Sequence, residues 1–446
     1  MNVPVSQPTT VRFRVLAWAC SLSLLTYIDR VCIKQVEGDI SRDLGLTTEQ
    51  FSWVFASFAF SYAIFEVPTG WLGDRLGPRK VLTRIVIWWS AFTALTGMVW
   101  RFRWETDGYA GYVFFFDSWL LLVLIRFLFG IGEAGAYPNL ARGLRSWFPF
   151  HQRGRTQGLV WMFARWGGAV APPLIAFFAH RFGWRGAFYV FGAIGALWAA
   201  CFWMSFRDRP EDHPGVNDAE KDFIRTEPGP KIVEQRPLSW ATMLSSRSLW
   251  LLSAMYFCSN AGWYFFITWD RRYYESVLQL AGNDLVFASS APLFFGGFAC
   301  IFGGFLTDRL VGVLGRRWGR TLQGAVAYML GGLFFLLAMI VRDPWISVVL
   351  LCIASFTKDF AMGVSWATCL DIGHRYSGTV SGFMNMVGNL GGAVSSVVVA
   401  SVAKQGDWNL ALGFSGVMFL ISAGCWLFIE PRRVVVYDVS NATQTS

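Results

Sequence analysis

The chain carries one polar signature twice, and this repeat decides the fold. The first copy reads Gly70-Trp71-Leu72-Gly73-Asp74-Arg75-Leu76-Gly77-Pro78-Arg79-Lys80. The second copy reads Gly304-Phe305-Leu306-Thr307-Asp308-Arg309 and continues, after a longer loop, with Gly315-Arg316-Arg317. Each copy follows a long apolar stretch at the same place in its half of the chain. The repeat predicts two duplicated helical bundles, an architecture that membrane transporters build around a central binding site.

The composition places this repeat in a membrane protein. Of the 446 residues, 54% are hydrophobic and only 15% are charged, and 41 are Phe and 23 are Trp. Soluble domains carry roughly 25% charged residues, and a soluble chain of this length would need polar surfaces around several domains. The charges are too few for such surfaces. We therefore expect a polytopic α-helical protein embedded in a lipid bilayer.

Twelve apolar stretches are long enough to cross a bilayer, which takes about 20 residues each. They lie at residues 14–35, 51–72, 81–100, 116–142, 155–180, 184–206, 247–269, 283–306, 320–341, 344–370, 375–403 and 408–430. These stretches predict an all-α membrane fold of twelve transmembrane helices in two pseudo-symmetric six-helix bundles. The expected parts are an N-terminal bundle at 1–206, a charged cytoplasmic connector at 207–246, and a C-terminal bundle with a short cytoplasmic tail at 247–446.

The distribution of positive charge predicts the orientation of the helices. Most of the 38 Lys and Arg residues fall at the two termini and in the even-numbered connections. Cytoplasmic loops are enriched in these residues. We therefore expect a multi-pass protein of the plasma (inner) membrane with both termini in the cytoplasm. The same loops account for the net charge of +9, so we expect no nucleic-acid partner.

The signature at residues 70–80 resembles the loop motif of the major facilitator superfamily, and both halves carry it. Four segments further resemble the anion:cation symporter branch of that superfamily. They lie at residues 27–30, 126–139, 158–173 and 377–392. That branch transports hexuronates, galactonate, glucarate and related sugar acids, and has animal relatives for sialic acid, glutamate and phosphate. The resemblance covers nearly the whole chain and implies the major facilitator fold. In one departure, Asp270 follows Trp269 where the branch often has a proline nearby.

Ionisable residues inside the predicted spans are the main functional candidates. A charge at a helix centre costs roughly 2.5–3.5 kcal/mol on insertion scales, so a chain keeps such residues for pairing or for function. They are Asp29, Arg30, Arg126, Glu133, Arg165, Lys358 and Asp359. Arg126 and Glu133 are two turns apart on one helix face, and Arg30 lies one turn from Tyr27. We expect the first and fourth spans to present an arginine and a carboxylate each to a shared cavity.

The chemistry of these groups predicts a substrate site and a proton site. Arginine offers a planar donor fork that matches a carboxylate, and a carboxyl group in low dielectric can exchange a proton near neutral pH. The resemblance implies that Arg30 binds the substrate carboxylate and that Asp29 and Glu133 are linked to protons. Protonation of Glu133 would then free Arg30 or Arg126 from an internal ion pair. The alternatives are a fixed Arg126–Glu133 packing pair and a static partner role for Asp29.

Further polar residues in the spans can complete the binding site. The candidates besides Arg30 and Arg126 are Tyr27, Tyr62, Arg165, Tyr264, Ser365, Trp366, Asn385 and Asn389. The hydroxyls of a sugar acid need neutral hydrogen-bond partners in a dry pocket, and the resemblance implies that Tyr62 and one of the two asparagines lie near substrate. Each candidate is equally consistent with interhelical bonding. Arg165 can instead pair with another span, and Lys358 and Asp359 can neutralise one another.

The repeated signature predicts a gate latch at the cytoplasmic edge. A carboxylate such as Asp74 can pair with basic residues and helix ends when this side closes. The expected gating residues are Asp74, Arg75, Arg79, Lys80, Asp308 and Arg309. We also expect Glu66, just before Pro68, to belong to this latch rather than to the binding site. The alternative is that the basic residues only fix the topology of the loop.

The sequence contains no nucleotide-binding glycine-rich loop, no catalytic triad and no metal-ligand spacing among its eight Cys. We expect no cofactor, no metal, no enzymatic activity and a monomer. The function predicted is proton-coupled symport of a small organic anion, with sugar acids such as hexuronates or aldonates leading over dicarboxylates, aromatic acids and phosphate. Anion exchange and a transporter-fold membrane sensor are the alternatives. Two protons moving with a monoanion would make transport electrogenic.

Overall fold

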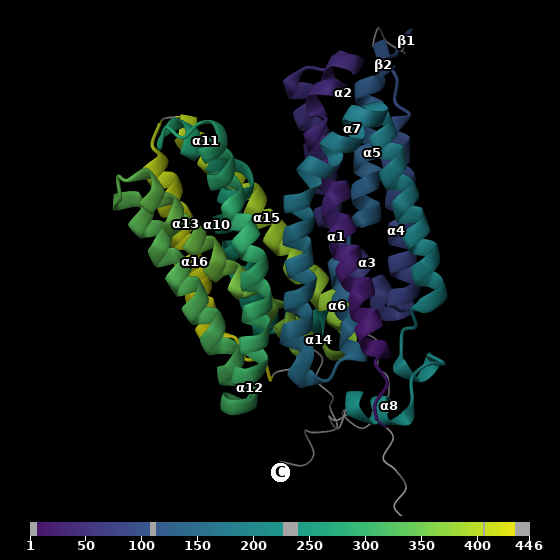
Figure 1. Ribbon diagram of the computed structural model, residues 1–446, viewed down its shortest axis with the longest axis vertical. Coiled ribbons are helices and arrows are strands. Elements are labelled where there is room, and N and C mark those ends of the chain that lie inside the picture. Colours follow the sequence, from purple (N-terminus) through teal and green to yellow (C-terminus); the bar gives the residue numbers. More distant parts are fainter. Residues whose placement is uncertain (1–6, 108–112, 226–239, 405, 433–446) are drawn as a thin grey trace, which may run out of the picture.

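Long helices account for most of the protein, whose computed structural model describes residues 7–107, 113–225, 240–404 and 406–432 (Figure 1). The N-half contains α1 (Val11–Gln35), α2 (Glu37–Leu44), α3 (Thr48–Leu76), α4 (Pro78–Gly97), α5 (Ser118–Glu133), α6 (Ala136–Trp147) and α7 (Arg153–Ser205). The C-half contains α10 (Arg247–Tyr264), α11 (Asp270–Ser276), α12 (Gly282–Ile340), α13 (Pro344–Phe360), α14 (Met362–Gly373), α15 (Ser377–Lys404) and α16 (Trp408–Phe428). Between the halves lie α8 (Asp218–Ile224) and α9 (Trp240–Leu244).

Seven helical stretches of the described residues are long and apolar enough to cross a membrane. Three of these stretches hold two crossings each. Helix α7 is interrupted by the non-helical Gly183 and α12 by the non-helical Gly315, and the third stretch turns back between α14 and α15. Helices α4 and α10 supply the remaining two crossings. The predicted twelve-helix membrane fold is therefore confirmed.

The two copies of the signature form the same kind of turn. Gly77 ends α3 with φ 89° and ψ 149°, and Pro78 begins α4. Gly315 separates the two crossings of α12 with φ 74° and ψ 172°. This region of positive φ is open essentially only to glycine. The glycine in each copy therefore permits the tight reversal between two membrane helices.

Two predicted spans are broken in the structure. The stretch expected at 116–142 ends as α5 at Glu133, and α6 begins after Gly135, which has φ 80°. The stretch expected at 344–370 divides at Ala361, between α13 and α14. The residues that follow Glu133 and those around Ala361 are small or apolar. Hydropathy therefore gives no signal of the break.

A short β-hairpin adds to the expected all-α architecture. Strand β1 (Arg103–Asp107) pairs antiparallel with β2 (Val113–Asp117), and Arg103 lies opposite Asp117. The second strand is rich in Val and Phe, which favour the extended conformation. The hairpin lies in the loop before α5, outside the membrane crossings. The membrane crossings themselves are helical, as predicted.

The two halves meet at one end of the molecule and separate toward the other (Figure 1). The end where they meet carries α8 and is named the connector end, and the far end carries α2, α11 and the hairpin. Helix α7 packs along α12 and α3 along α15. A Cβ on Gly70 would collide with the backbone of Gly378, and one on Gly304 with the backbone of Gly154. Glycines thus let helices of different halves approach closely near the connector end.

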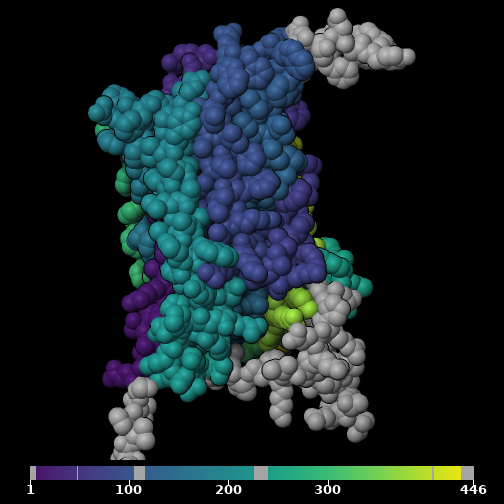
Figure 2. All heavy atoms as spheres, turned by 90° about the vertical axis from the view of Figure 1, so that its right-hand side faces the viewer, coloured from purple at the N-terminus to yellow at the C-terminus, as the bar shows by residue number. Residues whose placement is uncertain are grey.

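The outside of the bundle is apolar. Figure 2 faces the surface that α4 and the second crossing of α7 form. On these helices Ile87 is 53% exposed and Leu197 is 66% exposed. A hollow of about 510 Å³ on this surface is lined by α4 and Trp203 and holds none of the predicted substrate-binding residues. Exposed aliphatic side chains on membrane-length helices fit contact with lipid, as expected for a multi-pass protein.

Candidate functional site

A small cavity lies where the two halves face each other, and its volume is about 50 Å³. The N-half lines it with Tyr27, Arg30, Tyr62, Tyr137, Trp161 and Arg165, and the C-half with Tyr256, Asn260, Trp263, Tyr264, Lys358, Met362, Asn385 and Asn389. Seven of the ten residues predicted to bind substrate are therefore in its wall. The three others are Arg126, Ser365 and Trp366.

The N-half wall contains an ion pair between Arg30 of α1 and Glu133 at the end of α5. Arg30 donates from Nη2 to Oε1 of Glu133 at 2.6 Å and from Nε to the same oxygen at 3.0 Å. The Arg30 side chain is 25% exposed, whereas that of Glu133 is 1% exposed. The guanidinium also lies 4.6 Å from the ring centre of Tyr62. Arg30 is thus held by a buried carboxylate and still reaches solvent.

Arg126 and Asp29 lie behind this pair and do not line the cavity. The Arg126 guanidinium packs over the ring of Phe129 at 4.2 Å, and its side chain is buried. Asp29 is buried beside Arg126 and Glu133, and its Oδ1 has no hydrogen-bond partner among the described residues. The alternative of a fixed Arg126–Glu133 packing pair is wrong, because Glu133 pairs with Arg30.

A second charged cluster joins the two halves. Arg165 of α7 donates from Nη2 and Nε to the two carboxylate oxygens of Asp359 at 2.7 and 2.9 Å. Lys358 donates to Asp359 Oδ1 at 3.1 Å, and Arg165 also donates from Nη1 to the Tyr27 hydroxyl at 3.1 Å. Arg165 and Lys358 each lie 4.3 Å from the ring centre of Trp263. Arg165 therefore forms an ion pair with another span, through Asp359, which is one of the alternatives for this residue. It also borders the cavity.

Glu66 belongs to the cavity region and not to the latch, so that prediction is wrong. Its side chain is fully buried, and its Oε1 accepts a hydrogen bond of 2.6 Å from Asn385 of α15. Eight residues of helix separate it from Asp74, which is about 12 Å along the axis. The sequence places both on one helix but does not show at which depth the C-half contacts each.

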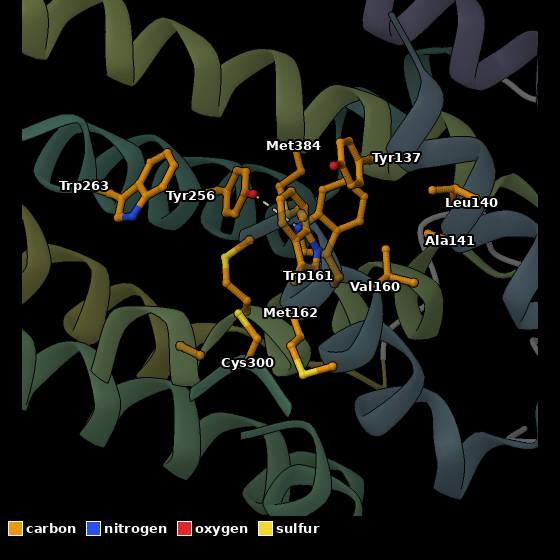
Figure 3. Close-up of a cluster of buried hydrophobic side chains, with 14 of the residues drawn as sticks. Tyr137, Leu140, Ala141, Val160, Trp161, Met162, Tyr256, Trp263, Cys300 and Met384 are labelled. Atoms are coloured by element: carbon orange, nitrogen blue, oxygen red, sulfur yellow. Dashed lines mark hydrogen bonds between the residues drawn. The ribbon is translucent and has the colours of Figure 1, made fainter. Parts of the chain in front are cut away.

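Aromatic side chains close the cavity on the connector side. Tyr137 and Trp161 of the N-half stack with ring centres 4.5 Å apart, and Tyr256 of the C-half faces them (Figure 3). The dashed line in Figure 3 ends on the Tyr256 hydroxyl, which accepts from Trp366 Nε1 at 3.2 Å. Trp366 packs against the stack, with its ring centre 5.3 Å from that of Trp161 and 6.2 Å from that of Tyr137. These rings form a floor on the connector side of the cavity.

Several residues of the cavity wall have no distinctive signal in the sequence. The sequence does not predict four aromatic residues of the wall, because aromatic residues make up 17% of the chain and occur in most spans. They are Tyr137, Trp161, Tyr256 and Trp263. Ser365, in contrast, was predicted as a ligand and instead donates to the carbonyl of its own helix at Ala361. A polar residue in a span is visible in the sequence, but the face it occupies in a broken helix is not.

The repeated aspartates form two equivalent contacts between the halves at the connector end. Asp74 of the N-half accepts from the backbone N–H groups of Gly378 and Thr379, at the start of α15, at 3.0 and 2.7 Å. Asp308 of the C-half accepts from those of Gly154 and Arg155, at the start of α7, at 2.8 and 2.9 Å. Each carboxylate thus binds the N-terminus of a helix in the opposite half, where it is favoured by the free N–H groups and the helix dipole.

The basic residues expected in the gate form no ion pair with the opposite half among the described residues, whereas Arg316 of the second copy lies over the ring of Phe150 in the N-half at 4.2 Å. Arg79 donates from Nη2 to the carbonyl of Trp203 at 2.5 Å, and its backbone N–H donates to Asp208 at 2.7 Å. Burial raises the pKa of Asp208, in the connector. Arg75 lies over the ring of its neighbour Trp71. Lys80 and Arg309 are exposed and form no ion pair among the described residues.

Further ion pairs at the connector end were not predicted. Asp371 of α14 accepts from Arg153 of α7 at 3.1 Å and from Arg320 at 3.2 Å. Arg142 of α6 reaches Asp74 at 3.2 Å. A further contact joins Arg145 and His374 at 3.0 Å. Two of these contacts, Arg153–Asp371 and Arg145–His374, join the two halves, and a third involves Asp74. A network of charged residues therefore closes the connector end.

The sequence family described as Major Facilitator Superfamily matches residues 19–396. The curated protein "Probable sulfoacetate transporter SauU" of Cupriavidus necator is 32% identical over 97% of this chain and 96% of its own length. The "Probable galactarate/D-glucarate transporter GudP" of Bacillus subtilis is 28% identical over 97% of this chain and 95% of its own. These relatives match from end to end and include both halves.

Solved structures show the same fold at low identity. The proton:xylose symporter XylE superposes with a TM-score of 0.72, covers 95% of this chain and 98% of that chain, and is 13% identical. The Escherichia coli fucose:proton symporter FucP superposes with a TM-score of 0.68, covers 94% of this chain and 100% of that chain, and is 14% identical. At these identities the likeness concerns the fold alone.

Proposed function

The chain belongs to the Major Facilitator Superfamily, and from this premise we propose that it is a proton-coupled symporter of a small organic anion that works by alternating access. The observation that carries this proposal is the Arg30–Glu133 ion pair in the wall of a cavity between the two halves. A cation held by a buried carboxylate offers both a binding site for an anion and a binding site for a proton.

The ion pair couples the two binding events. Two of the five N–H donors of Arg30 are bonded to one oxygen of Glu133. A carboxylate that binds this edge of the guanidinium must therefore replace Glu133. Protonation removes the charge of Glu133 and weakens charge-assisted hydrogen bonds, while the arginine stays charged throughout. Proton and anion thus favour each other's binding, and this reciprocity is what symport needs. Asp29, buried beside Arg126, is the second proton acceptor in this scheme.

The arrangement of the two ends supports alternating access. In this scheme the connector end and both termini face the cytoplasm of a cell with this protein in its inner membrane, since cytoplasmic loops are rich in Lys and Arg. The aromatic floor and the two aspartate contacts close that side, whereas Arg30 is partly exposed. Substrate enters from outside and leaves after these contacts open. One chain lines the whole cavity, so the monomer is the working unit.

The substrate class follows from charge and from the relatives. Arg30, Arg165 and Lys358 border the cavity, and the names of the relatives give sulfoacetate, galactarate and D-glucarate as their substrates. Each of these anions carries two acidic groups. Tyr62, Asn385 and Asn389 offer neutral hydrogen-bond partners for hydroxyls. We assign the substrate to small organic anions, sugar acids among them.

Uptake into proteoliposomes with an imposed pH gradient tests this function, with sulfoacetate and D-glucarate as the first labelled substrates. A proton symporter accumulates the anion against its gradient only when the pH gradient is present. Uptake that needs a preloaded counter-anion and ignores the pH gradient would show an exchanger. Saturable binding without any flux would show a sensor. Either of the last two results contradicts the proposal.

A further inference from the structure

The buried charges between the halves form two clusters of opposite net charge. The N-half cluster contains three carboxylates and two guanidinium groups, which gives a formal charge of −1. Its members are Asp29, Glu66, Glu133, Arg30 and Arg126. The second cluster contains Arg165, Lys358 and the single carboxylate of Asp359, which gives +1. The second cluster joins the halves, because Arg165 lies on α7 and the other two residues lie on α13.

Lys358 is the surplus cation of the second cluster. Arg165 already occupies both oxygens of Asp359 in a two-point contact at 2.7 and 2.9 Å. Lys358 shares one of these oxygens at 3.1 Å, and its other polar contact is the sulfur of Met362 at 3.4 Å. An ammonium group has three donors. At least one of them remains for a ligand, and Lys358 lines the cavity.

A buried surplus cation is costly unless an anion accompanies it. The side chain of Lys358 is 1% exposed, so water does not screen it as it would a surface lysine. The ring of Trp263 lies under both Lys358 and Arg165 and supplies a partial counter-charge through its face. An anionic group in the cavity would supply a full one.

We propose that Lys358 is the anion-binding group of the C-half, and that the substrate is a short dianion whose two acidic groups bind Lys358 and Arg30 at once. The inference rests on the proposed function and narrows its substrate class. Arg30 borders the cavity from α1 and Lys358 from α13, so one bound molecule contacts both halves. Binding of this kind draws the halves together around the ligand, as closure around a substrate requires.

The size of the cavity favours a short chain between the two acidic groups. A water molecule needs ~10–15 Å³ of such volume, so a cavity of about 50 Å³ has room for only a few atoms of that size. Tyr27 and Tyr264 border the same space.

Pairs of matched anions distinguish the binding of a dianion by Arg30 and Lys358 from the binding of any small organic anion. The pairs are succinate with butyrate, and sulfoacetate with ethanesulfonate, because each pair differs mainly by one acidic group at the end. Binding is measured by isothermal titration calorimetry on the full chain in nanodiscs. The measurements are repeated in parallel series at several pH values. The wild type is expected to bind each dianion roughly 10- to 100-fold more tightly than its monoanion, as expected for one added charge-assisted hydrogen bond.

Variants of Lys358 give the decisive comparison. Lys358→Gln is expected to weaken binding of the dianion at least tenfold more than binding of the monoanion, and Lys358→Arg is expected to keep the preference for the dianion. Lys358→Gln leaves Arg165 and Asp359 as a neutral pair, so the fold should persist, which thermal unfolding of the purified variant checks. Equal wild-type affinity for both members of a pair would overturn the inference, as would an equal loss of both in Lys358→Gln.

The failure of the proposed function has a different signature. If the wild type takes up butyrate in a proton-dependent way and shows no preference for succinate, symport stands and the dianion inference is wrong. If no anion of the panel binds to the wild type, both are wrong.

Discussion

The connector end and the cavity differ in how they follow the internal repeat. At the connector end Asp74 and Asp308 make the same contact in opposite directions, each with the N-terminus of a helix in the other half. In the cavity the halves are unlike, because the acids gather in the N-half and the surplus lysine lies in the C-half. The repeat thus persists where the structure closes and is lost around the cavity.

The difference has a physical basis in what each contact needs. A helix N-terminus offers free N–H groups whatever its side chains are, so a latch built on backbone donors survives divergence of the sequence around it. A site that binds both an anion and a proton needs basic and acidic side chains, and neither kind has to occur in both halves. Contacts that repeat in both halves therefore suit a gate that opens and closes. Charges that differ between the halves suit a site that binds an anion together with a proton.

The largest effect is expected for a change of Glu133 in the cavity region. Glu133→Gln removes the proton-binding group and leaves a neutral side chain beside Arg30. We expect proton-driven accumulation to be lost while exchange of labelled for unlabelled anion continues, because substrate no longer competes with a charged partner. Both activities are measured in proteoliposomes. Accumulation against a gradient by this variant would exclude Glu133 as the coupling residue.

A conservative change of Arg30 tests the same wall with a smaller effect. Arg30→Lys keeps the charge but loses the two-point geometry, since lysine has no planar fork. We expect the KM for uptake to rise roughly 10- to 100-fold, equivalent to about 1.5–3 kcal/mol for hydrogen bonds to a charged group. Arg272→Lys, an exposed change outside both the cavity and the latch, serves as the control. Unchanged KM in Arg30→Lys would place the anion elsewhere.

The latch predicts two equal effects. Asp74→Ala and Asp308→Ala each remove a carboxylate from a helix N-terminus, and loss of such a cap costs about 0.5–2 kcal/mol. We expect both variants to shift the population toward an open connector end by similar amounts. Spin labels at Arg84→Cys and Gly312→Cys, on a background without the partly exposed native cysteines, report the separation of the halves. A large effect from only one aspartate would show that the latch does not follow the repeat.

The smallest expected effect concerns Glu66, and it tests whether this residue belongs to the cavity region or to the latch. Glu66→Gln keeps an oxygen that accepts from Asn385 and changes only the charge. We expect the distance between the same spin labels to stay unchanged, whereas the affinity for substrate changes by less than tenfold, a difference of under about 1.4 kcal/mol. An opening of the connector end like that of Asp74→Ala would return Glu66 to the latch.

Patterns along the chain were sufficient for the class of fold. Apolar stretches of membrane length, the repeated signature and the positive loops predicted twelve crossings in two halves. Arg30 and Glu133 stood out because a charge in hydrocarbon is rare and costly. The aromatic floor had no such signal, and the breaks after Glu133 and at Ala361 left no trace in hydropathy.

Only the tertiary structure decided which charges meet. The sequence placed Glu133 and Arg126 on one helix face, yet Glu133 pairs with Arg30 of another helix, and Arg165 finds Asp359 in the other half. Helical periodicity fixes the face of a residue, but pairing in low dielectric depends on distances of a few ångströms between helices that are far apart in the chain. The sequence therefore determined that buried charges exist, and packing determined which ones act together.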